Sequence, residues 1–298
     1  MLSVFQKQIN CSAVHWRGVD KAGWRAILPH TIFIKLDEMK TIKRDEFDAK
    51  MKELVFVDEL LPYINEDVIY NGMLTRGKEE IGTVGFAVTA TLDVFEAAKE
   101  KGCNALVVHH GIKFADKHLD RVSYGRFTWL VKNDITLWQS HFAIDAHPEL
   151  GNNAQILLAL GIKDTEPYLF HGEAPWGRVG EFEEARPFSE IIDQLYPQLS
   201  SELTMYDYGK PDVKRVVCVS GKGAPYDSDM DLLIEDGVDL YITGEVHEWN
   251  RNCFKEAGIN FLAGGHYHTE TFGVRAVQER VEQEMGLKTV WLDFPNPV

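Results

Sequence analysis

The sequence lacks the features that mark membrane, exported and disulfide-rich proteins. Its 298 residues contain no apolar run near the ~18 residues needed to span a bilayer. The amino terminus has no charged region followed by an apolar core and a small-residue cleavage site. The four cysteines are widely spaced, without a Cys-x-x-Cys pair, which argues against both a disulfide framework and a thiolate zinc site. We therefore expect a cytoplasmic protein without a membrane partner, whose thiols are reduced and mostly buried.

Positive charge is also scarce. The chain has 31 Lys and Arg against 46 Asp and Glu, a formal net charge of −15. Non-specific binding to a phosphate backbone depends on basic residues that release counterions, so nucleic acid is not an expected partner. The Gly-x-Ser-x-Gly and Gly-x-x-x-x-Gly-Lys-Ser/Thr motifs are absent, as is His-Glu-x-x-His. These absences exclude serine-hydrolase and P-loop functions.

Residues 1–38 differ from the rest of the chain. They show no sustained helical or strand period, and a regular amphipathic pattern begins only after Met39. We predict a poorly ordered extension or a misplaced start codon, followed by a domain at residues 39–298; a partner-binding arm is the alternative. Within the domain, apolar spacing first predicts a helix between residues 41 and 61, limited by Pro62.

A strand, a helix and a second strand follow. Residues 83–91 (TVGFAVTAT) are rich in β-forming types, residues 94–101 have a helical pattern that Gly102 stops, and residues 105–108 are apolar. This order predicts parallel pairing of the two strands.

Two adjacent imidazoles, His109 and His110, end the second strand in the run LVVHHG. Open α/β sheets place their ligands at the carboxyl ends of strands, so this is a candidate metal site. A lone histidine is more often structural, and the pair by itself leaves both interpretations open.

A weak repeat places polar residues at other strand ends. Residues 102–110, 237–245 and 258–266 each start at a glycine, have Asn or Asp two places later, and continue through an apolar strand to a ligand-capable eighth residue. We expect three helix–turn–strand units that deliver polar side chains to the same edge of one or two sheets; generic α/β patterning is the alternative. The eighth residues are His110, Glu245 and His266.

Asp145 lies beyond another predicted strand, residues 135–141, which ends at His141. We expect it in a loop before a helix that Asn152 or Asn153 can cap. A carboxylate there can bind a metal ion or simply form a turn.

The last candidates precede the carboxyl-terminal helix predicted over residues 271–285. Glu270 would lie in its first turn, where the helix dipole favours a carboxylate whether or not it is catalytic. His247 lies at another strand end, and residues 220–223 are a candidate backbone cradle for an anion. Histidines and carboxylates together suit zinc, iron, manganese, nickel or cobalt, and carboxylates can bridge two ions.

In combination, these segments resemble the Nif-three-like proteins, also called the YbgI-type or GTP-cyclohydrolase-type-two-like family. The resemblance runs from Met39 to the end and implies an α/β fold of two intertwined α/β/α subdomains with mainly parallel sheets. It further implies a change of subdomain near residues 165–185, a metal site in the cleft between the subdomains, and a ring-shaped homohexamer. The segments that carry it are residues 106–111, 133–153, 243–246 and 265–270.

The resemblance also implies a ligand set for two divalent metal ions per subunit. No catalytic residue is assigned, and the family's acidic-Trp-Asp-Asn-Val-Gly-Leu motif is replaced here by residues 70–73 (YNGM). The implied metal ligands are His109, His110, Asp145, His266 and Glu270. Candidate supporting or proton-transfer groups are His141, Glu245 and His247.

The predicted function is a metal-dependent hydrolase acting on a nucleotide-like or other small substrate. GTP-cyclohydrolase-like activity is implied by the resemblance alone, since no motif specifies a guanine pocket. The alternative is a metal-binding regulatory or metal-trafficking protein, which would use the same five ligands without turnover. A nucleic-acid clamp is opposed by the charge balance.

The contrast between residues 1–38 and the rest gives a first prediction. A chain that starts at Met39 should fold and retain the metal content of the full chain, because the removed segment has neither the period nor the motifs of the domain. Metal analysis and sedimentation of both proteins measure this. Aggregation of the short chain would show that the segment is structural.

Overall fold

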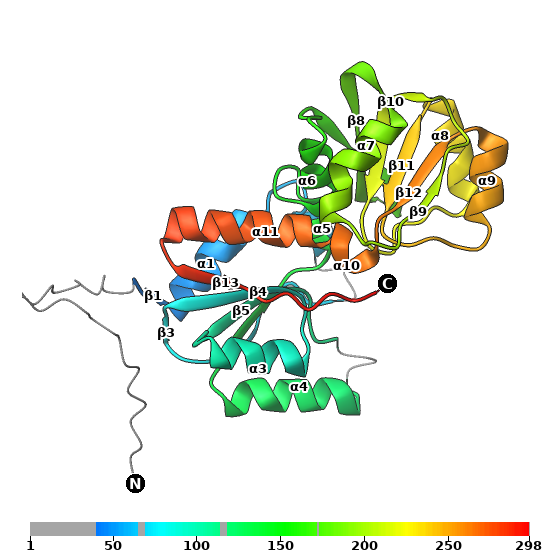
Figure 1. The fold of residues 1–298 in the computed structure, drawn as a ribbon. Coiled ribbons are helices and arrows are strands. Elements are labelled where there is room, and N and C mark those ends of the chain that lie inside the picture. The colour runs from blue at the N-terminus through cyan, green and yellow to red at the C-terminus, as the bar shows by residue number, and fades with distance from the viewer. Residues whose placement is uncertain (1–39, 65–68, 114–117, 172, 298) are drawn as a thin grey trace, which may run out of the picture. The chain divides into compact units, whose positions relative to one another are not determined.

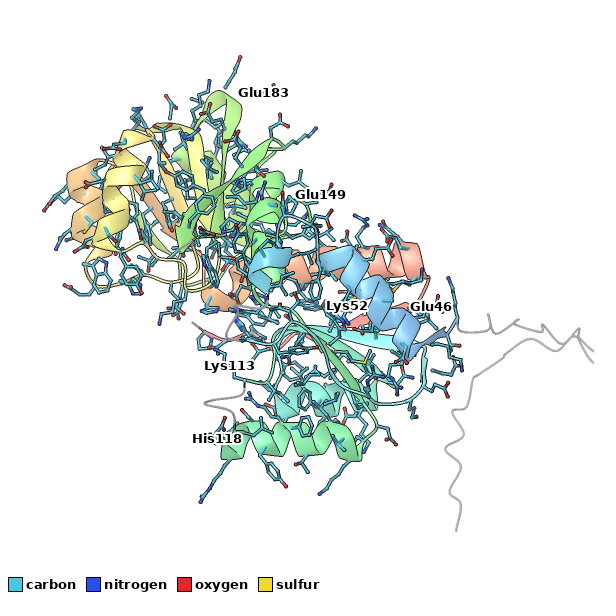
Figure 2. The ribbon with its side chains drawn as sticks, turned by 180° about the vertical axis from the view of Figure 1, so that it is seen from behind. Glu46, Lys52, Lys113, His118, Glu149 and Glu183 are labelled. Carbon is cyan, nitrogen blue, oxygen red and sulfur yellow. The ribbon has the colours of Figure 1, made fainter. Side chains whose placement is uncertain are left out.

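The computed structural model describes residues 40–297 except 65–68, 114–117 and 172. The predictions about residues 1–38 and a start at Met39 concern residues outside the described ones and stay predictions. No helix of the described part is long and apolar enough to cross a membrane. The acidic excess lies on the surface, as the exposed Glu46, Glu149 and Glu183 illustrate (Figure 2).

A five-stranded sheet carries the predicted strand–helix–strand unit (Figure 1). The first four strands of its order run parallel, and the last is antiparallel. Its order is β13 (Lys288–Trp291), β4 (Thr83–Thr89), β5 (Ala105–His110), β6 (Thr136–Gln139) and β2 (Gly72–Thr75).

Helices cover both faces of this sheet, which explains the unbroken apolar runs in its strands. In β5, Val107 belongs to the core shared with α1 (Arg44–Val55) and α11 (Thr271–Arg280). The next residue, Val108, belongs to the opposite core, shared with α3 (Leu92–Glu100) and α4 (Arg121–Lys132). Successive side chains of a strand point to opposite faces, so both faces must be apolar.

The second sheet has six strands, in which β10 pairs in parallel with β11 and β11 with β12, and the other neighbouring strands pair antiparallel. Its order is β7 (Thr165–His171), β8 (Ala174–Pro187), β10 (Asp212–Val219), β11 (Leu240–Thr243), β12 (Asn260–Ala263) and β9 (Thr204–Tyr206). Helices α6 (Asn152–Ala159) and α7 (Phe188–Leu195) contribute to the core on one face. Helices α8 (Met230–Glu235) and α9 (Asn250–Ala257) contribute to the core on the other.

The chain then returns to the first sheet. After β12 it forms α10 (His266–Thr269), α11 and a π-helical turn (Val281–Met285) before β13 pairs in parallel with β4. The predicted α/β fold of two intertwined subdomains is confirmed, with sheets that are more mixed than expected. The remaining elements are β1 (Ile42–Lys43), β3 (Glu80–Ile81), α2 (Leu61–Ile64), α5 (Phe142–Ala146) and 3-10 turns at Tyr196–Gln198 and Asp227–Asp229.

The single helix predicted between residues 41 and 61 is wrong in its second half. Helix α1 ends at Val55, where the N–H of Phe56 closes the last turn on the carbonyl of Lys52. Pro62 lies in the first turn of the separate helix α2, a position that a proline tolerates because its missing N–H has no intrahelical acceptor. Apolar spacing continued across the break because both helices face the same core.

The three repeat units are present as helix, left-handed glycine and strand. Gly102, Gly237 and Gly258 have φ of 75°, 64° and 66°, which a residue with a Cβ adopts at a cost. The side chain of the Asn or Asp two places after each glycine accepts hydrogen bonds from backbone N–H groups of another segment of the chain. Asn104 accepts from Thr83 N–H, Asp239 from Lys214 and Arg215 N–H, and Asn260 from Gly209 N–H.

Asn260 gives a stability prediction. Its amide accepts from Gly209 N–H at 2.9 Å and donates to the Lys210 carbonyl at 2.8 Å, and the residue is buried. Asn260→Ala leaves both backbone groups without this partner and should lower the free energy of unfolding by about 2 kcal/mol in urea denaturation. The exposed Asn252→Ala on α9 is the control, and equal stabilities of the two variants would contradict this role.

Candidate metal centre

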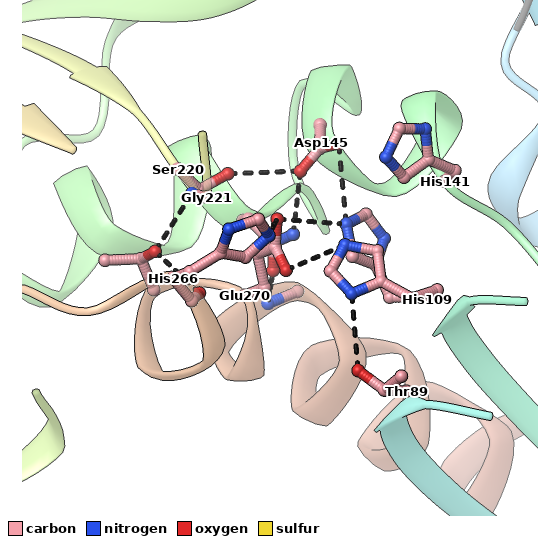
Figure 3. A network of polar contacts seen from close by, with 12 residues as sticks. Thr89, His109, His141, Asp145, Ser220, Gly221, His266 and Glu270 are labelled. Carbon is pink, nitrogen blue, oxygen red and sulfur yellow. Dashed lines mark hydrogen bonds and ion pairs between the residues drawn. The ribbon is translucent and has the colours of Figure 1, made fainter. Parts of the chain in front are cut away.

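The five ligands implied by the resemblance come together where strand-end segments of both sheets meet (Figure 3). His109 and His110 end β5, Asp145 lies in α5, and His266 begins α10. Glu270 connects α10 to α11. The loop prediction for Asp145 is wrong, because a short helix follows β6 directly and buries the carboxylate.

Glu270 lies at the centre of the cluster. Its Oε1 is 3.5 Å from Nε2 of His109 and 3.1 Å from Nε2 of His266, and its Oε2 is 3.1 Å from Nε2 of His110. The carboxylate is buried, with 3% of the residue exposed. Burial disfavours its charged form, but the imidazoles of His109 and His110 outweigh burial and hold the pKa of Glu270 well below its usual range.

Two of the imidazoles have a defined tautomer in their neutral form. Nδ1 of His109 lies 3.0 Å from the Ser140 carbonyl, and Nδ1 of His266 lies 2.5 Å from Glu245 Oε1. Both partners only accept, so each Nδ1 carries the proton and each Nε2 presents a lone pair to the cluster. A carboxylate behind a histidine is the usual support of a metal ligand.

The donor atoms of the cluster approach one another at ion-pair distance, but several of them make no hydrogen bond. Among the described residues, Nε2 of His109, Nε2 of His266 and Oε2 of Glu270 are buried and find no partner with hydrogen-bond geometry. Buried polar atoms in proteins are almost always paired. Lone pairs that converge in this way fit a metal cation, and the nitrogen and oxygen donors fit a divalent transition ion.

The electrostatics of the cluster also favour a cation. Burial lowers the pKa of His109, but Asp145 and Glu270 outweigh it and raise that pKa to about 9. Burial acts likewise on His266, and Glu270 and Glu245 raise its pKa to about 9. A site that draws a proton this strongly also draws a metal ion, which competes with protons for the same lone pairs.

Three overlapping groups of side chains have ligand atoms within 4.8 Å of one another, so the donors suffice for more than one position. One group adds His141, whose ring lies 5.0 Å from that of His109. The groups are His109–His110–His141, His110–His266–Glu270 and His109–Asp145–Glu270.

Asn152 or Asn153 was expected to cap the helix, and this prediction is wrong. The N-cap of α6 is Gly151, and both amides are fully buried inside the helix start. Asn152 donates to Asp145 Oδ1 at 3.0 Å and accepts from the N–H of Gly273 in α11 at 2.7 Å. Asn153 accepts from Ser220 N–H at 2.7 Å and donates to the Trp176 carbonyl at 2.8 Å.

These amides are therefore positioning residues that the sequence interpretation missed. They hold Asp145 and join α6 to segments that precede or follow it by many residues. The signal was present in the sequence as two consecutive amides seven and eight residues after a candidate ligand.

Residues 220–223 were predicted to form a backbone cradle for an anion, and this prediction is wrong for the first two N–H groups, because both already donate within the protein. The N–H of Ser220 is bound to Asn153, and that of Gly221 to Thr269 Oγ1 at 3.0 Å. Ser220 acts through its hydroxyl instead, which donates to Asp145 Oδ1 at 3.1 Å.

A cavity of about 310 Å³ opens onto the cluster. His141 and Trp176 form part of its wall, and the lysines Lys113 and Lys222 also line it. Glu245 reaches the site through His266. His247 is not among the described residues that line this cavity; its ring stacks on Trp249 and Tyr226.

Comparisons with known proteins identify the family of this chain. The profile of Duf34/NIF3 (NGG1p interacting factor 3) matches residues 49–297. A Pyrococcus horikoshii protein named GTP cyclohydrolase 1 type 2 homolog is 34% identical over 252 residues, covering 80% of this chain and 98% of that protein. An Escherichia coli K12 protein of the same name is 35% identical over 237 residues, covering 78% and 92%.

Solved structures share the fold. A structure titled protein ybgI, unknown function, superposes with a TM-score of 0.74 at 32% identity, covering 86% of this chain and all (100%) of that one. A Thermus thermophilus protein gives a TM-score of 0.73 at 28% identity over 86% and 100%. The chain belongs to the Duf34/NIF3 family.

Gly221 gives a prediction for the centre. A Cβ at this residue would lie 2.0 Å from Glu270 Oε1, and φ is 59°. Gly221→Ala should lower metal content strongly and also cost about 1 kcal/mol of stability from its backbone conformation. Gly237→Ala is the matched control, because φ there is 64° and its Cβ would meet no described atom within 4 Å.

Elemental analysis and urea denaturation of both variants separate the two effects. Equal metal content in Gly221→Ala and Gly237→Ala would show that the close approach to Glu270 has no bearing on metal binding.

Proposed function

We propose that this member of the Duf34/NIF3 family is a hydrolase that uses two divalent metal ions per subunit and acts on a nucleotide-like or other small substrate. The observation that carries the proposal is the set of buried, unpaired donor atoms around Glu270 at the base of an accessible cavity. The proposal of GTP-cyclohydrolase-like chemistry is based only on the names of the relatives.

The ligand roles follow from the donors. His109, Asp145 and Glu270 would hold one ion, and His110, His266 and Glu270 would hold the other. Bound there, the ions would supply Lewis acidity for a water and for the developing negative charge of the substrate.

The remaining residues position these groups and handle protons. Glu245 fixes the ring of His266, and the Ser140 carbonyl fixes the ring of His109. Asn152 and Ser220 both donate to Oδ1 of Asp145, which leaves Oδ2 to face His109 at 3.5 Å. His141 lines the cavity and is the group best placed to exchange a proton with a substrate held there.

The cavity favours a hydrolase over a metal-storage or metal-trafficking protein. Storage needs only affinity and is served by a closed shell of ligands, whereas hydrolysis needs an open coordination position and a wall for the substrate. The family also leads us to propose a homohexamer, which sedimentation of the purified chain measures.

The test begins with metal analysis of protein purified without added metal. We expect about two ions per subunit, and the metal-loaded protein should hydrolyse at least one compound in a screen of nucleotides, phosphoesters and cyclic amides. Metal without turnover on any of these would favour the non-catalytic alternative. Absence of metal would contradict the centre itself.

Asp145→Asn tests the ligand that is most easily mistaken for a structural residue. The variant keeps the shape but removes a charge that offsets the ions, so metal affinity measured by calorimetry should fall by about tenfold or more. The control is His147→Gln, because Nδ1 of His147 accepts from the N–H groups of Glu149 and Leu150 and serves the local turn. Parent-like affinity in Asp145→Asn would remove this residue from the centre.

A further inference from the structure

We infer that the substrate of this centre carries a phosphate group, which Lys113 and Lys222 bind at the mouth of the cavity. The inference rests on the proposed function, since it takes the metal-loaded centre as its base. It concerns the group by which the substrate is held, not the bond that is cleaved.

The loaded centre would be cationic. Two divalent ions bring more positive charge than the carboxylates of Asp145 and Glu270 can balance, and the histidines add none in their neutral, ligating form. A cationic centre in a protein with a net charge of −15 is a local reversal of sign. Such a reversal attracts anions to this cavity.

Two lysines extend this positive region outward. Lys113 lies three residues beyond the end of β5, and Lys222 three residues beyond the end of β10. The two side chains therefore line the same cavity, each from a segment that follows a strand of a different sheet. Both are exposed at its mouth, and Figure 2 shows Lys113 beyond the strands of the first sheet.

Three described lysines have a carboxylate partner among the described residues, and Lys113 and Lys222 are among those that have none. Lys43 pairs with Glu80, Lys52 with Asp48 at 2.8 Å and Lys210 with Asp239 at 3.0 Å. No described carboxylate lies within ion-pair distance of Lys113 or Lys222, although the chain has 46 acidic residues. Two ammonium groups at a cavity mouth without a carboxylate partner are suited to an anion from outside.

The geometry favours phosphate over carboxylate. A phosphate monoester has three strongly accepting oxygens and up to two negative charges, so it can contact lysines on both walls and still face the metal ions. A carboxylate has only two oxygens to share among these cations. The cavity of about 310 Å³ is at the small end for ligand sites and suits a small phosphorylated molecule.

The test measures binding of inorganic phosphate to the full-length, metal-loaded protein by calorimetry at constant ionic strength. Lys113→Ala and Lys222→Ala should each weaken phosphate binding by about tenfold, and Lys222→Arg should retain most of it. Lys255→Ala, an exposed lysine on α9, is the control with parent affinity. Metal content should be unchanged in all four variants, because none replaces a ligand.

A second pair of probes distinguishes a phosphorylated substrate from free phosphate. Ribose 5-phosphate should bind at least as tightly as inorganic phosphate, and ribose should not bind measurably. Equal affinity for the two sugars would overturn the inference.

The outcomes for the inference and for the proposed function differ. Parent-like phosphate affinity in the double variant Lys113→Ala/Lys222→Ala would overturn the role of the lysines. A metal-loaded protein that binds no phosphate would overturn the substrate class but leave the metal centre standing. A protein that holds no metal would overturn the proposed function, and this inference with it.

Discussion

The buried carboxylate of Glu270 is the constraint on which the candidate centre depends. An ionised carboxylate removed from water is costly unless charge and polar contacts replace its hydration. Here the imidazoles of His109, His110 and His266 approach it at 3.1 to 3.5 Å. These residues come from two sheets, so the charge of Glu270 is balanced only when both sheets are in place. The requirement extends to Gly221, where a side chain would occupy the space of the carboxylate oxygen.

The same constraint explains why amides, rather than charged groups, join the segments around the site. Asn152 and Asn153 reach the backbone of α11, of β8 and of the segment after β10 while adding no charge next to the ligands. Each amide accepts one hydrogen bond and donates another. These hydrogen bonds pair backbone groups that would otherwise be buried without a partner where the segments meet. The contacts of Asn152 hold the Asp145 carboxylate in one position relative to His109. A metal centre requires ligands whose positions are fixed in this way.

Local sequence pattern was sufficient for much of the fold and for the polar strand ends. The apolar run before His109 and His110 predicted a buried strand correctly, because a strand that is buried on both faces of its sheet must be apolar at successive residues. The repeat glycines predicted three helix–strand turns, because a left-handed residue after a helix is most often glycine. Long-range partners were not predictable in this way: Asn152 at a helix start has the same local signature as a cap. Whether it caps the helix or binds Gly273, 121 residues away, is decided only by packing. Apolar spacing likewise could not show that α1 and α2 are separate.

Placing the centre between two sheets has a chemical consequence. A ligand shell built within one element tends to close around an ion, whereas strand ends that meet from two sides leave a space between them. On the buried side, Ser140 and Glu245 hold the rings of His109 and His266, so the ligands cannot turn outward. On the other side, the cavity is lined by His141, Trp176 and lysines from both sheets. In the proposed function, the buried side would therefore supply affinity for metal and the open side access for a substrate. Four of the five candidate ligands, His110, Asp145, His266 and Glu270, also line the cavity, so a substrate held there would lie directly against the proposed metal ions.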